Sequence, residues 1–401
     1  FNFDMFVYVI GWIGAVLLSS AGISSLVGVY LFRYYGLRRV ALASAILTII
    51  AFISTPYIPN LSYVFLTYSI PFGIATGFHE CITVVSLREY FFKQLGLATG
   101  IRYAASGIGT MLVSYLIPII FDVAGWQVMI TSFASLGLMF AVYAMSYQPL
   151  PIVEEGNISD AMLHTRELSK FENGCLQATK SLLKDKRMLM FLTGNALFSV
   201  IQYIPNIFMI QYARSLGYPI TKSKWMLVSF SSLSIVSRSV SGCVSDHVIK
   251  FNRMRILHSA VMILFGIFSA ACSLTNSLIL MTVYMGGIGV LDGMYWVMLS
   301  LVAMEINHQN SDITFTLLLF ATACGYLVGP PAIGWLYDAT GKFSHVLYAV
   351  SAGGVTAGAF VFAGTLWKAE PGLYKEMAKQ VIKTSELKKC SLVVLERETV
   401  V

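Results

Sequence analysis

The chain has 401 residues, of which 57% are hydrophobic and 12% are charged, and its mean hydropathy is +0.73. A soluble domain carries roughly 25% charged residues, so this composition excludes a soluble globular protein and predicts an all-α integral membrane protein. The formal net charge of +7 does not indicate a nucleic-acid partner, because the basic residues lie in short loops between apolar segments, where they orient membrane spans.

Apolar segments long enough to cross a bilayer recur along the whole chain. A spanning helix needs about 20 predominantly apolar residues, and the sequence predicts eleven spans: 5–31, 40–58, 62–87, 97–120, 125–147, 188–213, 225–245, 256–274, 279–304, 313–336 and 343–367. The chain begins with Phe1 and enters its first span almost at once, without a cleavable signal peptide. We expect a fragment or variant in which an upstream helix is missing.

The distribution of Lys and Arg predicts the orientation of the spans. Basic residues gather in loops 32–39, 88–96 and 246–255, on the same side as the long segment 148–187. The positive-inside rule places that side in the cytoplasm, although loop 214–224 on the opposite side is also basic. We expect a multi-pass protein of the plasma membrane.

Segment 148–187 is the only long polar insertion between spans, and it separates five spans from six. We therefore expect an N-terminal half at 1–147, a cytoplasmic linker at 148–187, a C-terminal half at 188–367 and a cytoplasmic tail at 368–401. The last four residues of the tail, ETVV, loosely fit the ligand of a PDZ protein.

Glycines recur at a nearly constant offset in the two halves. The paired positions are Gly28 with Gly242, Gly73 with Gly289, and Gly77 with Gly293. Chance is the alternative explanation, since glycine is common where membrane helices touch. A repeat in the same order and orientation predicts two helix bundles around a central cavity, and five plus six spans again indicate one missing helix.

A loop motif connects this repeat with a known superfamily. Gly242 and Asp246 have a Gly-x-x-x-Asp spacing followed by basic residues, which resembles the cytoplasmic loop of major facilitator transporters. The copy in the first half has Phe32 where the acid is expected. We assign cytoplasmic gate loops to Gly28, Arg38, Arg39, Lys93, Gly242 and Asp246.

The segment EYFFKQLGLATGIRYAASGIG (89–109) resembles the YF-x-K-R-R-x-LA-x-G signature of the monocarboxylate transporter family. Segments 203–217, 121–126 and 317–341 are similar to the family's seventh helix, its turn into helix 6 and its eleventh helix. The chain departs from the signature after Lys93, where Gln and Leu replace a basic pair.

This resemblance implies a major facilitator fold of two pseudo-symmetric bundles that begins at the family's second helix. It implies a carrier of small monocarboxylates or related organic anions and zwitterions that works by alternating access, by symport if a proton moves with the substrate. It also implies a single-span ancillary glycoprotein as a partner in the bilayer. The alternatives are a facilitative carrier resembling those of aromatic amino acids and thyroid hormones, and a non-transporting sensor or defective truncated isoform.

Arg238 lies about halfway along an apolar span, where a charge costs at least ~2.5–3.5 kcal/mol and normally faces a partner or a water-filled path. Its position matches the helix 8 arginine that, in the family, pairs with a substrate carboxylate, which a guanidinium can bind bidentately. Ser234 stands where proton-coupled members carry an aspartate. Asp292 lies at a similar depth in the ninth span, so we expect it to pair with Arg238 until a substrate carboxylate competes. A purely structural ion pair is the alternative.

A second group of charges lies in the first half. Glu80 and Arg102 are at the same depth in neighbouring spans, which predicts an ion pair that lowers the cost of burying each charge. We favour a structural role for this pair. The adjacent His79 could relay protons, but a hydrogen-bonded histidine is the more common case.

Polar residues also interrupt the sixth span, which contains Asn195, Gln202 and Asn206. Pro205 removes a backbone hydrogen bond there, and such a break is tolerated where a helix lines a cavity or where neighbouring groups satisfy the backbone. We expect Tyr203 and Asn206 to line the substrate path.

The chain has no nucleophile elbow, phosphate-binding loop or metal-ligand spacing, which argues against an enzyme. Its six cysteines are scattered without CxxC spacing, so we predict no disulfide framework, metal site or cofactor.

Overall fold

A computed structural model describes residues 3–91, 94–147, 177–250, 253–307 and 310–366. Within these ranges every regular element is a helix. The first group of α-helices comprises α1 (Phe3–Tyr35), α2 (Leu37–Ser54), α3 (Ile70–Tyr90), α4 (Leu95–Ser132) and α5 (Ala134–Ser146). The second comprises α7 (Lys186–Gln202), α8 (Ile204–Ser215), α9 (Ile220–Lys250), α10 (Met254–Ser273), α11 (Leu278–Ile306), α12 (Ser311–Thr340) and α13 (Phe343–Thr365).

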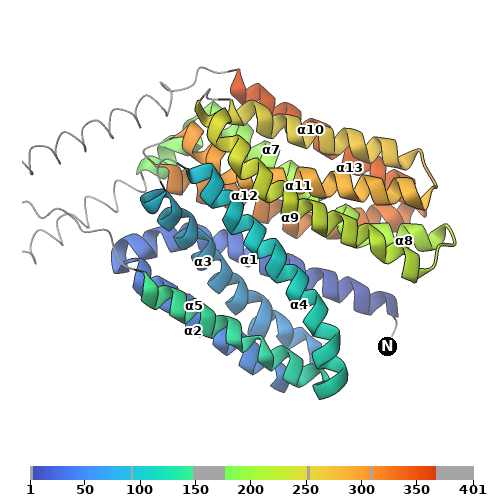
Figure 1. The fold of residues 1–401 in the computed structure, drawn as a ribbon, viewed down its shortest axis with the longest axis horizontal. Helices are drawn as coiled ribbons and strands as arrows, with labels where there is room; N and C mark the ends of the chain where they lie inside the picture. Colours follow the sequence, from blue (N-terminus) through green and yellow to red (C-terminus); the bar gives the residue numbers. More distant parts are fainter. Residues whose placement is uncertain (1–2, 92–93, 148–176, 251–252, 308–309, 367–401) are drawn as a thin grey trace, which may run out of the picture.

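The helices form two bundles, one from each half of the chain (Figure 1). In the first, α1 packs on α3, and α2 packs on α3 and α5; in the second, α9 packs on α11, α10 on α13, and α7 on α12 and α13. Contacts between the bundles come mainly from α1 with α12 and from α4 with α9. The predicted all-α architecture of two bundles is therefore confirmed.

Ten stretches of the described chain are long and apolar enough to cross a membrane, rather than the eleven predicted. The difference arises at α4, which contains the predicted span 97–120 and continues without a loop into the next. Its backbone turns at Gly125, where φ is 80°, a conformation that glycine adopts readily. The predicted span 188–213 is instead broken at Tyr203 into α7 and α8, with Pro205 in the first turn of α8.

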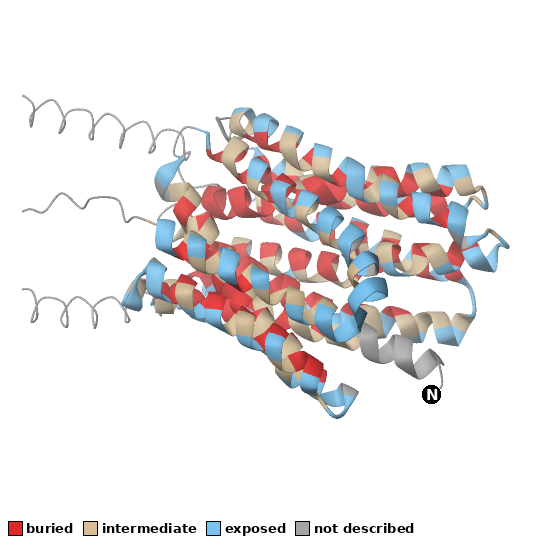
Figure 2. Ribbon diagram, turned by 60° about the horizontal axis from the view of Figure 1, so that its bottom comes forward, coloured by how far each residue is buried: buried red, intermediate tan, exposed pale blue. Residues whose placement is uncertain are grey.

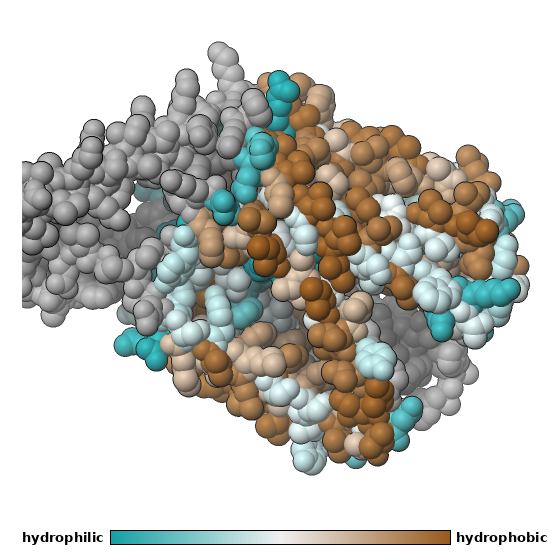
Figure 3. Space-filling view, viewed as in Figure 1, coloured by the Kyte–Doolittle hydropathy of each residue, from teal (hydrophilic) through white to brown (hydrophobic). Residues whose placement is uncertain are grey.

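Buried residues concentrate where helices face one another (Figure 2). α11 is the most enclosed helix of the second bundle, with 78% of its apolar window buried, whereas only 11% is buried in the stretch Ile119–Ser146. The outer surface is rich in exposed apolar side chains such as those of Val236, Val240 and Leu264, and apolar patches extend across the visible face (Figure 3). This distribution fits contact with lipid.

Two of the predicted glycine pairs, Gly73 with Gly289 and Gly77 with Gly293, make equivalent contacts in the two bundles. A Cβ on Gly77 of α3 would collide with the carbonyl oxygen of Ala21 of α1, and a Cβ on Gly293 of α11 would collide with that of Ser234 of α9. Ser234 lies 213 positions after Ala21, and Gly293 lies 216 positions after Gly77. The glycines therefore allow the same close helix contact twice, which supports the repeat.

The third pair is not equivalent. Gly28 faces Phe78 within the first bundle, whereas Gly242 lies against Gly96 and Gly100 of the other bundle. The shared sequence motif therefore serves two different contacts, one inside a bundle and one between bundles.

The bundles meet on the predicted cytoplasmic side. There, Gly100 and Gly107 of α4 lie against Gly242 and Ile235 of α9. Beyond this contact the two helices separate towards the opposite face (Figure 1). The structure thus has a closed contact at one end and a space between the bundles farther along.

Candidate substrate-binding site

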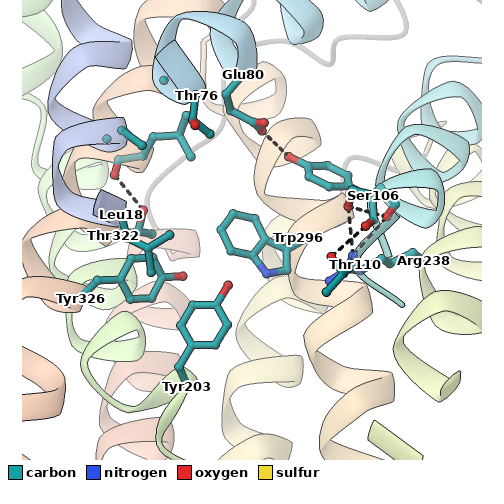
Figure 4. Close-up of a pocket in the computed structure, with 15 residues that line it drawn as sticks. Leu18, Thr76, Glu80, Ser106, Thr110, Tyr203, Arg238, Trp296, Thr322 and Tyr326 are labelled. Atoms are coloured by element: carbon teal, nitrogen blue, oxygen red, sulfur yellow. Dashed lines mark hydrogen bonds between the residues drawn. The ribbon is translucent and has the colours of Figure 1, made fainter. Parts of the chain in front are cut away.

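A cavity of about 300 Å³ lies between the bundles, and its lining side chains come from α1, α3, α4, α9, α11 and α12 and from Tyr203 at the break between α7 and α8 (Figure 4). Small-molecule sites are typically concave and apolar, with a few placed polar groups. Here the apolar walls include Leu18, Leu319 and Trp296, and the charged groups on the lining are Glu80 and Arg238.

Arg238 connects three helices around this cavity. Its Nη2 lies 3.3 Å from Oδ2 of Asp292 on α11, and its Nη1 donates to the Tyr103 carbonyl oxygen at 3.1 Å and to Ser106 Oγ at 3.2 Å on α4. The Arg238 side chain is 15% exposed, whereas that of Asp292 is 4% exposed. The predicted pairing is therefore present, with the arginine at the cavity surface and the aspartate behind it.

Asp292 has two further partners. Gln202 of α7 donates from Nε2 to Asp292 Oδ1 at 2.8 Å, and Ser234 of α9 donates to Oδ2 at 3.3 Å. The hydroxyl of Tyr326 on α12 donates to Gln202 Oε1 at 2.7 Å. The Asp292 carboxylate therefore keeps two donors, Gln202 and Ser234, when its contact with Arg238 is withdrawn.

The opposite wall carries the second charged pair. Arg102 forms an ion pair with Glu80 as predicted, and the Tyr103 hydroxyl donates to Glu80 Oε1 at 3.1 Å. The Arg102 guanidinium also lies 4.5 Å from the centre of the Tyr103 ring, within the range of a cation–π contact. The Glu80 side chain is 25% exposed and lines the cavity.

His79 does not line the cavity. Its ring stacks on Phe140 with centroids 4.1 Å apart and lies edge-on to Tyr143 at 5.4 Å. Nδ1 of His79 is buried and has no hydrogen-bond partner among the described residues. The histidine is thus packed between α3 and α5, away from the substrate path.

The break between α7 and α8 separates the two residues predicted to line the path. Tyr203 lines the cavity, where its ring faces that of Tyr326 at a centroid distance of 5.1 Å. Asn206 lies about one turn farther along α8 and is not among the lining residues. Because Tyr203 lies at the break and Asn206 within α8, the two side chains have different surroundings.

Comparison with known proteins places the chain in a family. The model of the Major Facilitator Superfamily matches residues 2–315. The chain belongs to the Major Facilitator Superfamily.

Within this superfamily the curated relatives include monocarboxylate transporters. The chain is 23% identical to monocarboxylate transporter 2 of Mus musculus over 370 residues, which covers 88% of this chain and 75% of the relative. It is 25% identical to monocarboxylate transporter 4 of Gallus gallus, covering 88% and 73%, and 22% identical to monocarboxylate transporter 10 of Homo sapiens, covering 86% and 67%. The resemblance in the sequence motifs is confirmed.

Solved structures show the same fold. The fucose:proton symporter of E. coli has a TM-score of 0.66 at 12% identity and covers 89% of this chain and 91% of its own. A double Trp mutant of XylE has a TM-score of 0.63 at 17% identity and covers 94% and 90%. A transporter of this superfamily is not an enzyme, and the described residues contain no group of three His, Cys, Asp or Glu side chains that could hold a metal ion.

The predicted gate loop of the second half contributes a contact between the two bundles. Asp246 of α9 accepts hydrogen bonds from the backbone N–H groups of Gly96 at 2.7 Å and Leu97 at 3.0 Å. These groups belong to the first turn of α4, whose N–H groups lack partners within the helix. The carboxylate therefore caps α4 and interacts favourably with its dipole.

The corresponding contact of the first half uses different chemistry. Phe32 is buried, while the adjacent Arg33 forms an ion pair with Asp312 in the first turn of α12. Arg88 of α3 adds a hydrogen bond to Ser311 Oγ at 2.9 Å. Neither Arg33 nor Asp312 was predicted as a gate residue, although both lie at helix ends on the predicted cytoplasmic face.

The remaining predicted gate residues differ in position. Arg38 and Arg39 are exposed in the first turn of α2, and Lys93 lies outside the described residues.

Proposed function

We propose that this transporter carries a small monocarboxylate or related organic acid by alternating access, with Arg238 as the group that binds the carboxylate. The observation that supports this proposal is the position of Arg238, whose guanidinium lines the cavity between the bundles while its partner Asp292 lies behind it. A guanidinium offers two parallel donors to a carboxylate, which gives both affinity and orientation.

The surroundings of Asp292 favour exchange of partners at Arg238. When a substrate carboxylate approaches, Asp292 can give up its contact with Arg238 because Gln202 and Ser234 still donate to it. Breaking a buried pair normally leaves an uncompensated charge, and these two donors reduce that cost.

Alternating access would then follow from rocking of the two bundles about the cavity. We propose the domain limits predicted from the sequence, with the halves at 1–147 and 188–367 joined by a cytoplasmic linker at 148–187. The linker and the tail at 368–401 lie largely outside the described residues. We also propose the plasma membrane as the location.

Three further features remain proposals. Coupling to a proton would involve Glu80, which lines the cavity, or Asp292, which lies behind Arg238, rather than His79. A single-span ancillary glycoprotein is implied by the likeness to monocarboxylate transporters, and a PDZ protein by the chain's last residues. Co-purification from membranes of expressing cells would test both partners.

The function is tested by measuring the uptake of radiolabelled lactate, pyruvate and phenylalanine by cells that express the chain. Arg238→Lys should abolish uptake while biotinylation shows normal surface expression, because an ammonium cannot provide the same paired donors. Full uptake by Arg238→Lys would refute the role of Arg238. If no acid entered by a saturable route, a non-transporting sensor or inactive isoform would be favoured.

A further inference from the structure

Glu80 differs from an acid that only holds helices together. Its side chain is 25% exposed at the cavity wall. By contrast, Glu305 in the pair with Arg255 is 2% exposed, accepts from Arg255 Nε at 2.6 Å and from the Met254 N–H at 2.8 Å, and does not line the cavity. Glu80 is therefore available to a ligand in a way that Glu305 is not.

Tyr103 connects Glu80 with Arg238. The hydroxyl of Tyr103 donates to Glu80 Oε1 at 3.1 Å, and the carbonyl oxygen of the same residue accepts from Arg238 Nη1 at 3.1 Å. A partly exposed carboxylate and a partly exposed guanidinium thus contact opposite ends of a single tyrosine residue. In Figure 4 the Glu80 side chain lies at the top of the view and that of Arg238 at the right, and Trp296 lies below Glu80 and to the left of Arg238.

The charges around the cavity balance. Two carboxylates, Glu80 and Asp292, face two guanidinium groups, Arg102 and Arg238. A bare anion would bring an uncompensated negative charge into this partly buried site, and such a charge is costly away from water. A zwitterion adds no net charge and can place each of its ends against a group of opposite sign.

The arginine of each ion pair has an N–H group that is free to form a further hydrogen bond. Nη1 of Arg102 and Nε of Arg238 are buried without hydrogen-bond partners among the described residues. When a ligand cation approaches Glu80, Arg102 can still hold the carboxylate from behind, just as Gln202 and Ser234 hold Asp292.

We propose that Glu80 is a second recognition group, which binds the ammonium group of the substrate, so that the site takes an α-amino acid with an apolar side chain rather than a simple monocarboxylate. This inference rests on the proposed function, because it uses Arg238 as the carboxylate end. The apolar side chain would lie among Trp296, Tyr203 and Leu319, which line the same cavity.

The first test compares three radiolabelled compounds that differ only in their charged ends: phenylalanine, 3-phenylpropionate without the ammonium, and phenethylamine without the carboxylate. Uptake of phenylalanine should exceed that of either analogue by about tenfold or more, the effect expected from losing one hydrogen bond to a charged group. Equal or faster uptake of 3-phenylpropionate would overturn the inference and leave the proposed function standing. Absence of uptake of both carboxylates would instead refute the proposed function.

The second test changes Glu80 and Arg102 together, to Glu80→Gln and Arg102→Gln, so that no single charge is left unpaired. The ratio of phenylalanine to 3-phenylpropionate uptake should fall towards one at equal surface expression. The matched control, Arg255→Gln with Glu305→Gln, removes an ion pair away from the cavity and should keep the wild-type ratio. A ratio unchanged by the Glu80 and Arg102 double variant would contradict the inference. A second result would also contradict the inference: low pH stimulates the uptake of 3-phenylpropionate by the wild type but not by the double variant. Glu80 would then be a proton site.

Discussion

Replacement of Asp246 by alanine should weaken the contact that closes the predicted cytoplasmic face. The carboxylate accepts two backbone hydrogen bonds at the start of α4, at 2.7 and 3.0 Å. Hydrogen bonds to charged groups contribute about 1.5–3 kcal/mol each, and a charge at a helix N-terminus adds ~0.3–1 kcal/mol. Since Asp246 is partly exposed, we expect a total loss of about 2–3 kcal/mol, which corresponds to about 30- to 150-fold in the equilibrium between the closed and open states of this face.

The shift can be followed by labelling a cysteine in the cavity. Thr110 lines the cavity from α4, beyond the contact between α4 and α9. A Thr110→Cys reporter, in a background with the exposed Cys243 and Cys324 replaced by serine, would react with a membrane-impermeant maleimide added outside. In Asp246→Ala the labelling rate should fall by about tenfold or more, because molecules leave the state in which the predicted cytoplasmic face is closed.

Two matched variants make this experiment decisive. Asp246→Asn keeps one acceptor oxygen and should therefore lower the labelling rate about half as much as Asp246→Ala does. Lys184→Ala removes an exposed charge on the same face and should leave the labelling rate unchanged. Labelling of Asp246→Ala at the wild-type rate would refute the view that this cap holds the bundles together.

Other predictions concern packing and the site. Gly77→Leu should prevent stable folding, because even a Cβ there would collide with α1. The measurement is surface expression, which should be lost. Gly334→Ala should be tolerated, because nothing lies within 4 Å of its Cβ position. Gln202→Ala should raise KM several-fold and lower the melting temperature in detergent, because it withdraws a donor from Asp292 at a cost of about 1–3 kcal/mol; an unchanged KM would exclude a supporting role. His79→Gln should leave the pH profile of uptake unchanged at equal surface expression, because His79 packs on Phe140 and lies off the cavity; a lost pH dependence would restore the relay hypothesis.

The sequence predicted those features that depend on position along a helix axis. Arg238 and Asp292 were matched by depth, as were Glu80 and Arg102, and both pairs are present. Depth follows directly from counting residues, because each adds about 1.5 Å along the axis. The glycine repeat similarly predicted two equivalent bundles.

The sequence did not predict the features that depend on which side of a helix faces the cavity. Gln202 and Asn206 are both polar residues near the same helix break, yet Gln202 holds Asp292 while Asn206 lies off the cavity. Residues four apart share a face in an unbroken helix, but the break at Tyr203 separates these two, and which side then faces the cavity depends on how neighbouring helices pack. Hydropathy could not supply that direction here, because the spans are apolar on most sides. Tyr103 shows the same problem, since its role depends on contacts with both α3 and α9.

The contacts at the predicted cytoplasmic face show that the two halves can have a similar arrangement although one of them lacks the sequence motif. In one half α9 supplies an acid, Asp246, to the backbone of α4, and in the other half α1 supplies a base, Arg33, to the acid Asp312 in the first turn of α12. Both arrangements place a negative charge at the N-terminus of a helix, where the dipole stabilises it. The carboxylate can come from the neighbouring bundle or from the capped helix itself, provided that a contact across the bundles remains. Phe32 therefore stands in the half whose contact takes its negative charge from Asp312 of the capped helix, whereas the contact of the second half takes it from Asp246 of the neighbouring bundle.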